Sequence, residues 1–180
     1  MRILFLHGLE SKVGCEKVQW LQDQGHVVLN PEMKYRDKDC FEMTLRLAEM
    51  FKPEVIVGSS MGGHFAWLMG KLMTVPVCLL NPALWKRSFD PHIPVNDYNK
   101  ALKIAKEAGG SKVFMMLGYN DDVVNAHDTF QNMFKWDPYD YNPNNVYWHG
   151  RGHRTPADVF ARWFGRIEEG VIQNQKLEMV

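Results

Sequence analysis

Short apolar runs alternate along the chain with longer segments of mixed polarity. Continuous apolar runs are typical of strands buried on both faces of a sheet, and apolar residues three and four positions apart are typical of helices. The pattern predicts strands over residues 3–7, 26–29, 54–58, 75–80, 113–117 and 146–149. It predicts helices over residues 16–24, 39–51, 99–108, 124–134 and 156–168, and a further helix that follows Gly63 and ends near Met73. Residues 83–96 contain Pro91 and Pro94 without a clean period, which favours a loop.

Strands and helices that alternate in this way predict a mostly parallel sheet with helices on both faces. A length of 180 residues matches one domain. We expect that domain to span residues 1–170, and residues 171–180 to form a polar C-terminal tail. The fold class that the pattern predicts is an open, doubly wound α/β domain.

The composition is that of a globular protein, with 46% hydrophobic and 23% charged residues. A chain of this length buries enough surface to hold a core without a metal or a disulfide. Lys and Arg together number 21, as do Asp and Glu, so the formal net charge is zero. A neutral chain lacks the general attraction to phosphate that supports binding to nucleic acid or to anionic lipid. We therefore expect no nucleic-acid partner.

The three cysteines, Cys15, Cys40 and Cys78, form no CxxC pair. This count and spacing predict free thiols, with neither a disulfide framework nor a metal site. Free thiols are typical of the cytoplasm. The apolar run at residues 1–6 is too short for the core of a signal peptide or for a membrane span. The sequence thus predicts a cytoplasmic protein without membrane insertion.

Residues 58–62 read Gly-Ser-Ser-Met-Gly and match the pattern G-x-S-x-G. They follow a β-branched strand and precede an apolar helix, which is the setting of a nucleophile elbow. In such an elbow a strained turn exposes the hydroxyl of the central serine, and small neighbours let the strand and the helix approach closely. We predict that Ser60 is a nucleophile and that Gly58, Gly62 and Gly63 provide this space.

Two other interpretations of this segment are a tight turn without chemistry and a phosphate-binding loop with Ser59 and Ser60 as donors. A phosphate-binding loop usually offers a lysine nearby. The first lysine downstream is Lys71, on the far side of the predicted helix. The segment therefore favours the nucleophile.

A serine nucleophile needs a base, usually a histidine that a carboxylate orients, and α/β-hydrolases carry these groups in the chain order serine, acid, histidine. The loop after the fifth predicted strand carries Asp121 and Asp122, and the loop after the sixth carries His153. We favour Asp121 as the acid, with Asp122 as a helix cap or a solvated carboxylate. We favour His153 over His149 as the base, because His149 ends the strand whereas His153 lies in the loop.

Acyl transfer also needs hydrogen-bond donors for the developing oxyanion. One predicted donor is the backbone N–H of Met61, which follows the nucleophile. The other is the backbone N–H of Leu9, in the loop after the first strand. His7 and Gly8 are also compatible with a tight turn by which the chain leaves that strand, and His7 would then shape the loop. His64, in the elbow helix, is expected behind the site or at the surface. Candidates to line an acyl pocket are Met61, Leu84, Trp85, Tyr119 and Val123, although methionine and aromatic residues more often belong to the core.

Several segments taken together resemble one family: Leu6-His7-Gly8 with Ser11, Gly58 to Gly63, Asn81-Pro82-Ala83, Gly118 to Val124, and Gly152-His153. In this order, from residue 3 to about residue 165, they are similar to the small YqiA/YcfP-type esterases of the α/β-hydrolase superfamily. The resemblance implies an α/β-hydrolase fold and a serine hydrolase acting on acyl esters, with some activity on thioesters. It implies that Ser60, Asp121 and His153 are nucleophile, acid and base. Met61 replaces a common Leu, and residues 83–110 are too short for a full lid.

The sequence therefore predicts a serine esterase or thioesterase built on Ser60, Asp121 and His153, with the amides of Leu9 and Met61 as oxyanion donors and no cofactor or metal. Its expected partner is a small acyl ester or thioester, and a homodimer is compatible with the sequence. The alternatives are a serine peptidase or amidase on the same fold and a catalytically idle binding module. The complete Ser-Asp-His set disfavours the idle module.

Overall fold

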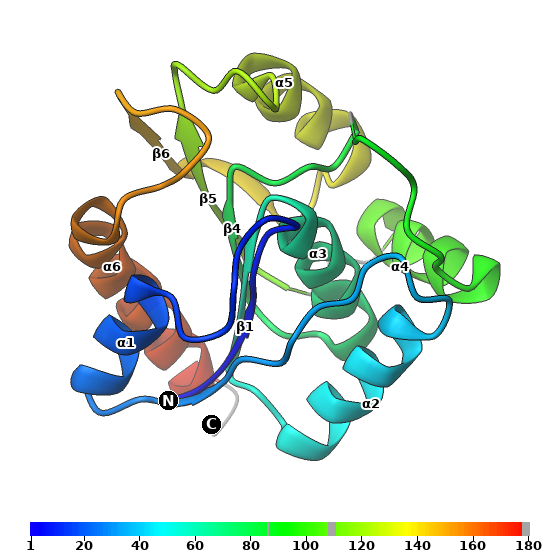
Figure 1. Cartoon of the computed structure of the whole chain (residues 1–180), viewed down its shortest axis with the longest axis horizontal. Helices are drawn as coiled ribbons and strands as arrows, with labels where there is room; N and C mark the ends of the chain where they lie inside the picture. The colour runs from blue at the N-terminus through cyan, green and yellow to red at the C-terminus, as the bar shows by residue number, and fades with distance from the viewer. Residues whose placement is uncertain (86, 108–110, 178–180) are drawn as a thin grey trace.

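The computed structural model describes residues 1–85, 87–107 and 111–177, with residues 170–177 as backbone only. Strands and helices alternate along these residues (Figure 1). The strands are β1 (Arg2–Leu6), β2 (Val27–Leu29), β3 (Val55–Ser59), β4 (Val77–Leu80), β5 (Val113–Gly118) and β6 (Tyr141–His149). The helices are α1 (Glu16–Asp23), α2 (Cys40–Phe51), α3 (Met61–Met73), α4 (Val95–Glu107), α5 (Ala126–Trp136) and α6 (Ala157–Leu177).

The strands form one sheet in the order β2-β1-β3-β4-β5-β6, and every pairing between them is parallel. The chain passes from β1 to one neighbour, β2, and then returns to the other side of β1 for β3. In an open parallel sheet, the loops at the carboxyl ends of the strands diverge at such a reversal and leave a crevice. The topology therefore favours a binding site after β1 and β3.

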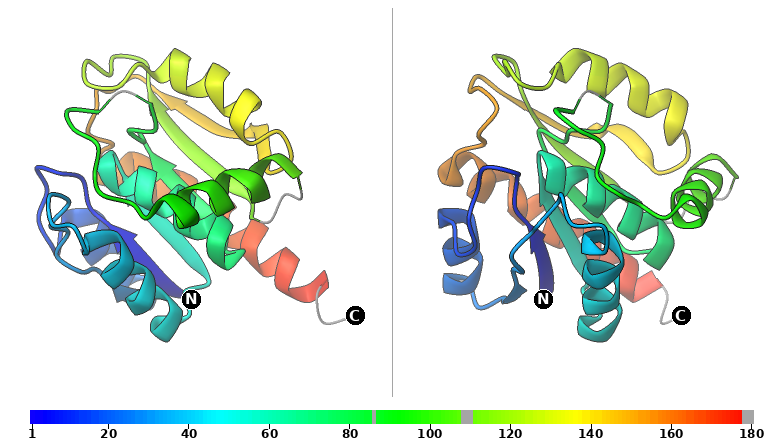
Figure 2. Two further views of the ribbon diagram at one scale, coloured as in Figure 1. Left: turned by 90° about the vertical axis from the view of Figure 1, so that its right-hand side faces the viewer. Right: turned by 45° about the vertical axis from the view of Figure 1, so that its right-hand side comes forward.

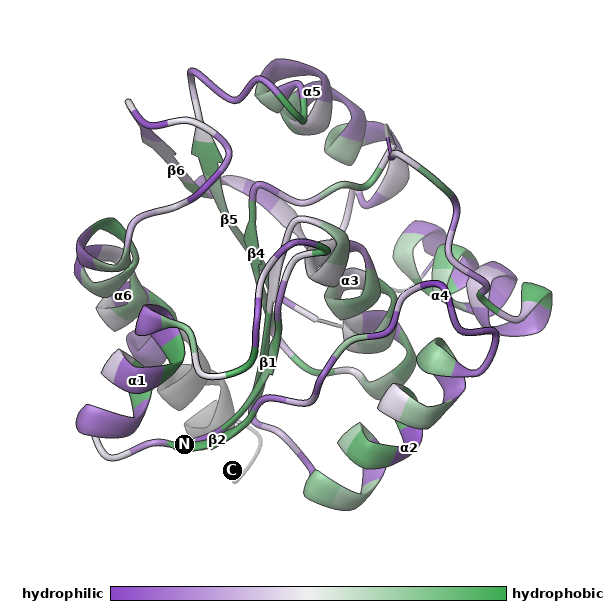
Figure 3. Cartoon of the chain, in the orientation of Figure 1, coloured by the Kyte–Doolittle hydropathy of each residue, from purple (hydrophilic) through white to green (hydrophobic). Residues whose placement is uncertain are grey.

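Helices cover both faces of the sheet (Figure 1). Ile3 and Phe5 of β1 share a buried cluster with Phe160 of α6, on the face that α1 and α6 cover. Leu4 belongs to the opposite cluster, together with Phe65 of α3, on the face covered by α2 to α5. Successive residues of a strand point to opposite faces, so a sheet covered on both sides needs the continuous apolar strands that the sequence shows. In Figure 3 the strands are mostly coloured as apolar, whereas the helices carry both apolar and polar residues.

A buried ion pair fastens the end of α3 to the segment that joins α5 and β6. The Nζ of Lys71 lies 2.6 Å from Oδ2 of Asp137 and 2.5 Å from Oδ2 of Asp140. The indole N–H of Trp67 donates to the same oxygen of Asp137 at 2.9 Å. Lys71, the first lysine after the Gly58–Gly62 segment, is thus paired with these carboxylates in the interior and does not face Ser60 as a phosphate-binding lysine would.

Three elements differ from their expected bounds by four residues or more. β6 begins at Tyr141 rather than at residue 146, since an edge strand pairs through its backbone and tolerates polar side chains and Pro143. α4 begins at Val95, directly after Pro94, rather than at residue 99, so the last two residues of the predicted loop are helical. The backbone of α6 stays helical past Gly170 to Leu177, because an isolated glycine weakens a helix without having to end it. Of the predicted tail, residues 178–180 lie outside the described residues.

Figure 2 shows the C-terminal end of α6 running beyond the sheet. Within the described part of the chain, no helix has both the length and the apolarity needed to cross a membrane.

Candidate functional site

Ser60 lies in the turn between β3 and α3 with strained backbone angles. Its φ is 52° and its ψ is −115°, a conformation that L-residues rarely adopt. Two backbone hydrogen bonds hold the turn in place: the N–H of Ser60 donates to the carbonyl of Leu80 at 2.9 Å, and the carbonyl of Ser60 accepts from the N–H of Ala83 at 2.9 Å. Strain of this kind persists only where the surroundings support it and is common at functional sites.

The glycines around Ser60 allow a backbone approach that a side chain would block. A Cβ atom on Gly58 would lie 2.3 Å from the carbonyl oxygen of Gly62, and one on Gly62 would lie 2.1 Å from that of Leu6. A Cβ atom on Gly63 would lie 2.7 Å from the Cβ of Pro82. The predicted reason for these glycines, close contact between strand and helix, is thus confirmed.

Three side chains from three separate loops meet at this turn. Nε2 of His153 lies 2.9 Å from Oγ of Ser60, and its Nδ1 lies 2.8 Å from Oδ2 and 3.0 Å from Oδ1 of Asp121. The three residues follow β3, β5 and β6, whose carboxyl ends lie at the same edge of the sheet. The hydroxyl therefore has a base within hydrogen-bond distance, and that base has a carboxylate on its other nitrogen.

Asp121 is the carboxylate that contacts His153. Its side chain is 1% exposed, and Oδ1 accepts from the backbone N–H groups of Val123 at 2.9 Å and Val124 at 2.8 Å. Burial alone raises the pKa of Asp121, but the hydrogen bonds from His153, Val124 and Val123 outweigh it and hold the pKa below its ordinary value. The carboxylate is therefore ionised at neutral pH.

Asp122 is exposed to solvent and does not cap the next helix. The N-cap of α5 is Asn125, whose side chain accepts from the N–H of Asp128 at 3.0 Å. Of the two roles expected for Asp122, the structure is consistent with the solvated carboxylate.

The other histidines near the site have structural partners or lie elsewhere. Nδ1 of His149 accepts from the N–H of Arg151 at 3.3 Å, and burial lowers the pKa of this imidazole. His7 is buried, with its Nδ1–H donating to the carbonyl of Gly8 at 2.8 Å and its Nε2 accepting from the N–H of Met33 at 3.0 Å. His7 thus shapes the loop after β1, as expected. His64 is buried on α3, so the expected surface position is wrong.

Asn81, at the end of β4, joins the acid loop to the base loop. Its Nδ2 donates to the carbonyl of His153 at 2.7 Å, and its Oδ1 accepts from the N–H of Gly118 at 2.7 Å. The side chain is buried, and its φ of 42° lies in the left-handed region, which Asn tolerates better than most residues. In the sequence, Asn81 stands out only as part of a family motif, because contacts with residues about 40 and 70 positions away leave no local pattern.

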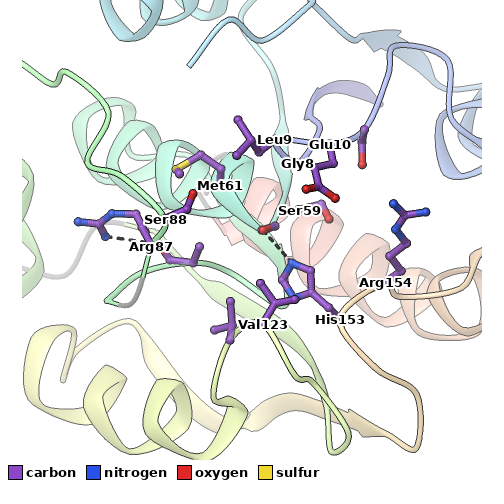
Figure 4. A pocket seen from close by; sticks show the side chains of 14 residues that line it. Gly8, Leu9, Glu10, Ser59, Met61, Arg87, Ser88, Val123, His153 and Arg154 are labelled. Atoms are coloured by element: carbon purple, nitrogen blue, oxygen red, sulfur yellow. Dashed lines mark hydrogen bonds between the residues drawn. The ribbon is translucent and has the colours of Figure 1, made fainter. Parts of the chain in front are cut away.

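A cavity of about 400 Å³ opens above Ser60 and His153. Figure 4 shows Arg87 and Arg154 on opposite sides of it, with Leu9 and Met61 along another wall. Of the five predicted lining residues, Met61 and Val123 do line the cavity. Leu84, Trp85 and Tyr119 do not.

Packing explains these three corrections. Leu84 is buried in the core, Trp85 packs on Trp136 with ring centroids 5.3 Å apart, and Tyr119 stacks on Trp148 at 4.7 Å. Leu84 thus belongs to the core, whereas Tyr119 is 57% exposed and packs at the surface, and residue type alone does not distinguish such positions from the cavity wall.

The two residues predicted as oxyanion donors, Leu9 and Met61, both line the cavity beside Ser60. Leu9 follows β1 and Met61 follows β3, the two strands between which the strand order reverses. The cavity therefore lies at the crevice that the topology favours. Among the described residues, no group of three or more His, Cys, Asp or Glu is arranged to hold a metal ion.

Solved structures with similar folds include three with informative names. A protein from Xanthomonas campestris assigned to the α/β hydrolase superfamily aligns with a TM-score of 0.66 and 16% identity, over 94% of this chain and 98% of that one. Esterase B from Lactobacillus rhamnosis aligns with a TM-score of 0.67 and 14% identity, over 99% and 78%. Acyl-protein thioesterase 2 from Zea mays aligns with a TM-score of 0.62 and 15% identity, over 94% and 93%. These similarities show that the chain has the α/β-hydrolase fold.

The sequence model of one family, described as the uncharacterised protein family UPF0227, matches residues 2–139. No curated protein matches the sequence.

Proposed function

The chain belongs to the family UPF0227, and we propose that it is a serine hydrolase that cleaves a carboxylic ester or thioester through an acyl-enzyme on Ser60. The observation that carries the proposal is the continuous set of hydrogen bonds from Ser60 through His153 to Asp121. A serine hydroxyl is a weak nucleophile until a base removes its proton. Here that base is 2.9 Å away.

In the first step, Oγ of Ser60 attacks the carbonyl carbon of the substrate while Nε2 of His153 takes the hydroxyl proton. The resulting imidazolium is stabilised by the ionised carboxylate of Asp121, which also holds Nδ1–H in the tautomer that leaves Nε2 free to accept. The low pKa of Asp121 keeps this carboxylate charged while His153 gains its proton.

The tetrahedral intermediate carries its negative charge on the former carbonyl oxygen. We assign the stabilisation of this oxyanion to the backbone N–H groups of Leu9 and Met61. Both residues line the cavity next to Ser60. Met61 is also the first residue of α3, so the positive end of the helix dipole adds to the stabilisation.

The intermediate collapses when the bond from carbon to the alcohol or thiol group breaks and His153 gives its proton to that leaving group. Water then attacks the acyl-enzyme, with His153 as base, and the acid product leaves as Ser60 regains its proton. Every atom that moves in these reaction steps comes from the substrate, water, Ser60 or His153, so the proposed chemistry needs no cofactor.

The ester or thioester class has support from the named neighbours, an esterase and an acyl-protein thioesterase of the same fold. The segment between β4 and α4, which would hold a lid, contributes Ala83, Arg87 and Ser88 to the cavity wall. A cavity of about 400 Å³ suits a small acyl substrate. We further propose a cytoplasmic enzyme, since Cys15, Cys40 and Cys78 are free thiols.

The proposal is tested with p-nitrophenyl esters from acetate to palmitate, comparing the wild type with Ser60→Ala. We expect the wild type to prefer one part of the series and Ser60→Ala to lower kcat by about 10⁴-fold or more. A fluorophosphonate should label the wild type at Ser60. The proposed hydrolase function would be refuted if Ser60→Ala turned over the esters as fast as the wild type. It would also be refuted if the wild type neither turned over any ester nor reacted with the fluorophosphonate. An ester and an amide with the same acyl group separate an esterase from a peptidase or amidase.

A further inference from the structure

The loop after β1 carries Leu9, whose backbone N–H is one of the two proposed oxyanion donors. Among the described residues, none accepts a hydrogen bond from this N–H, so it is free to donate to a substrate. Gly8, just before it, lies against the elbow, since a Cβ atom on Gly8 would lie 3.3 Å from the Cβ of Ser60. Figure 4 shows Gly8 and Leu9 beside Met61, which carries the other proposed donor. The groups that fix the direction of the Leu9 N–H therefore bear on the proposed reaction.

The peptide group between Gly8 and Leu9 is held by its carbonyl. That carbonyl accepts from the backbone N–H of Ser11 at 3.1 Å and from Nδ1–H of His7 at 2.8 Å. The C=O and the N–H of a trans peptide lie in one plane and point in opposite directions. Two donors that fix the carbonyl on one side therefore also fix the direction of the Leu9 N–H on the other.

His7 can hold this peptide group only while its own position is fixed, and the segment between β2 and α2 fixes it at two points. The backbone N–H of Met33 donates to Nε2 at 3.0 Å, which places the ring proton on Nδ1, the nitrogen that donates to the carbonyl of Gly8. The hydroxyl of Tyr35 donates to the carbonyl of His7. His7 and Tyr35 are both buried, so water does not compete for these hydrogen bonds.

The ring of Tyr35 is itself held by aromatic packing. It meets Phe65 of α3 edge to face with ring centroids 5.1 Å apart, and Phe65 meets Phe41 of α2 in the same way at 5.1 Å. The hydroxyl is thus carried by a ring that belongs to the buried core beside α2 and α3. A donor held by packed rings is in place before a substrate binds, which is what a preorganised site requires.

We propose that Tyr35 is a positioning residue for the oxyanion donor Leu9 and acts through the carbonyl of His7. That carbonyl accepts a hydrogen bond from no other described residue, so without the hydroxyl the peptide groups that follow it can rotate. Donors stabilise an oxyanion only when they point at the place where it forms, so the loss falls on the transition state rather than on substrate binding. This inference rests on the proposed hydrolase function, and it names a residue outside the cavity on which that function depends.

The test compares Tyr35→Phe with Tyr141→Phe, a matched control whose hydroxyl is also buried but has no hydrogen bond to any described residue. Both variants keep the aromatic ring. The values of kcat and KM are measured with a p-nitrophenyl ester, and kcat is expressed per chain that a fluorophosphonate labels at completion, so that unfolded chains do not count.

We expect Tyr35→Phe to lower kcat by about tenfold and to keep KM within about twofold of the wild type. The reason is that a misdirected donor loses part of the factor of about 10² to 10³ that removal of an oxyanion donor costs. Tyr141→Phe should keep both kcat and KM within about twofold.

A trifluoromethyl ketone probes the oxyanion contact directly, because Oγ of Ser60 adds to its carbonyl carbon while His153 takes the proton, and the resulting alkoxide occupies the place of the oxyanion. Its inhibition constant should rise by about tenfold in Tyr35→Phe, in parallel with the loss of kcat, and should stay unchanged in Tyr141→Phe. In the wild type, formation of the adduct should shift the amide NMR signal of Leu9, and in Tyr35→Phe that shift should be smaller.

A kcat for Tyr35→Phe equal to that of Tyr141→Phe would overturn the role of Tyr35, as would a lower kcat with an unchanged inhibition constant for the ketone. A lower melting temperature with wild-type kcat would also overturn it, because a merely structural hydrogen bond explains that result. Failure of the hydrolase function gives a different result, in which the wild type neither turns over the ester nor forms the ketone adduct. That result would refute the positioning role together with the reaction that it serves.

Discussion

Asn81 offers the sharpest test of how the site is held together. It makes two hydrogen bonds of 2.7 Å, one to the carbonyl of His153 and one from the N–H of Gly118. Asn81→Gly removes these two bonds and the longer ones from Nδ2 to the carbonyl of Gly152 and to Oγ1 of Thr155. It keeps the left-handed backbone free of strain, because glycine adopts the φ of 42° without cost. The effect on activity then reports the lost side chain rather than a distorted backbone.

The size of the effect follows from these contacts. Each lost bond costs about 1 kcal/mol net, so we expect the free energy of unfolding to fall by about 2 kcal/mol. The base loop loses its link to β4 and β5, and a displacement of about 1 Å takes His153 beyond hydrogen-bond range of Ser60, which is 2.9 Å away. A misplacement of that size lowers kcat by about 10²-fold with little change in KM.

A double-mutant cycle shows whether Asn81 acts through His153. Asn81→Gly is measured with a p-nitrophenyl ester in the wild-type background and in His153→Ala, with thermal unfolding of each variant to ensure that the assay temperature lies below the melting transition. If Asn81 positions the base, it has nothing to position once the imidazole is gone, and the second loss of kcat should be small. Equal losses in both backgrounds, or wild-type kcat in Asn81→Gly, would refute the positioning role.

Asp121→Asn should lower kcat by about 10⁴-fold, because an amide favours the wrong tautomer of the histidine. Asp122→Asn, at the exposed neighbour, should keep kcat within about twofold of the wild type. Similar ester kinetics for the two variants would contradict the assignment of Asp121 as the acid. Because the pKa of Asp121 lies below its ordinary value of 3.8, its contribution to stability is present above that pH and is lost as the pH falls through the folded-state pKa. Denaturant unfolding at about pH 6 and about pH 3 should therefore show a smaller acid-induced loss of stability for Asp121→Asn than for the wild type, and an equal loss would count against it. Gly62→Ala places a Cβ 2.1 Å from the carbonyl oxygen of Leu6 and should destabilise the fold by about 3 kcal/mol or more in thermal unfolding. Gly165→Ala on α6, where the Cβ would meet nothing within 4 Å, should instead be neutral or stabilising by up to about 1 kcal/mol, and matching losses for both would refute the close-packing explanation.

Much of the architecture can be read from the sequence because it depends on local patterns. Continuous apolar runs mark strands covered on both faces, and Gly58 and Gly62 mark a turn where the backbone must come close. The start of β6 at Tyr141 has no such mark, since an edge strand needs no apolar pattern to pair with β5. The continuation of α6 to Leu177 cannot be read from the sequence, since a glycine such as the one at position 170 ends some helices and is tolerated inside others.

The candidate site is predictable in its residue types and order along the chain, but contacts between distant residues have no local signature. The sequence offered Asp121 and Asp122 as neighbours, and only the folded loop shows that Asp121 contacts His153 while Asp122 is exposed. The burial of His64 has the same cause, because its charged neighbours Arg87 and Asp90 come more than 20 residues later in the chain.

The alternation of strands and helices and the elbow around Ser60 can be read from the sequence, since each depends on residues close together in the chain. The order of serine, acid and histidine along the chain can be read as well. Only the folded chain shows which carboxylate contacts the histidine and how Asn81 links two loops. Those features arise where parallel strands bring their carboxyl ends to one edge of the sheet, so that residues 60, 121 and 153 become neighbours. These residues become neighbours because of the strand order, and the strand order depends on packing over the whole domain.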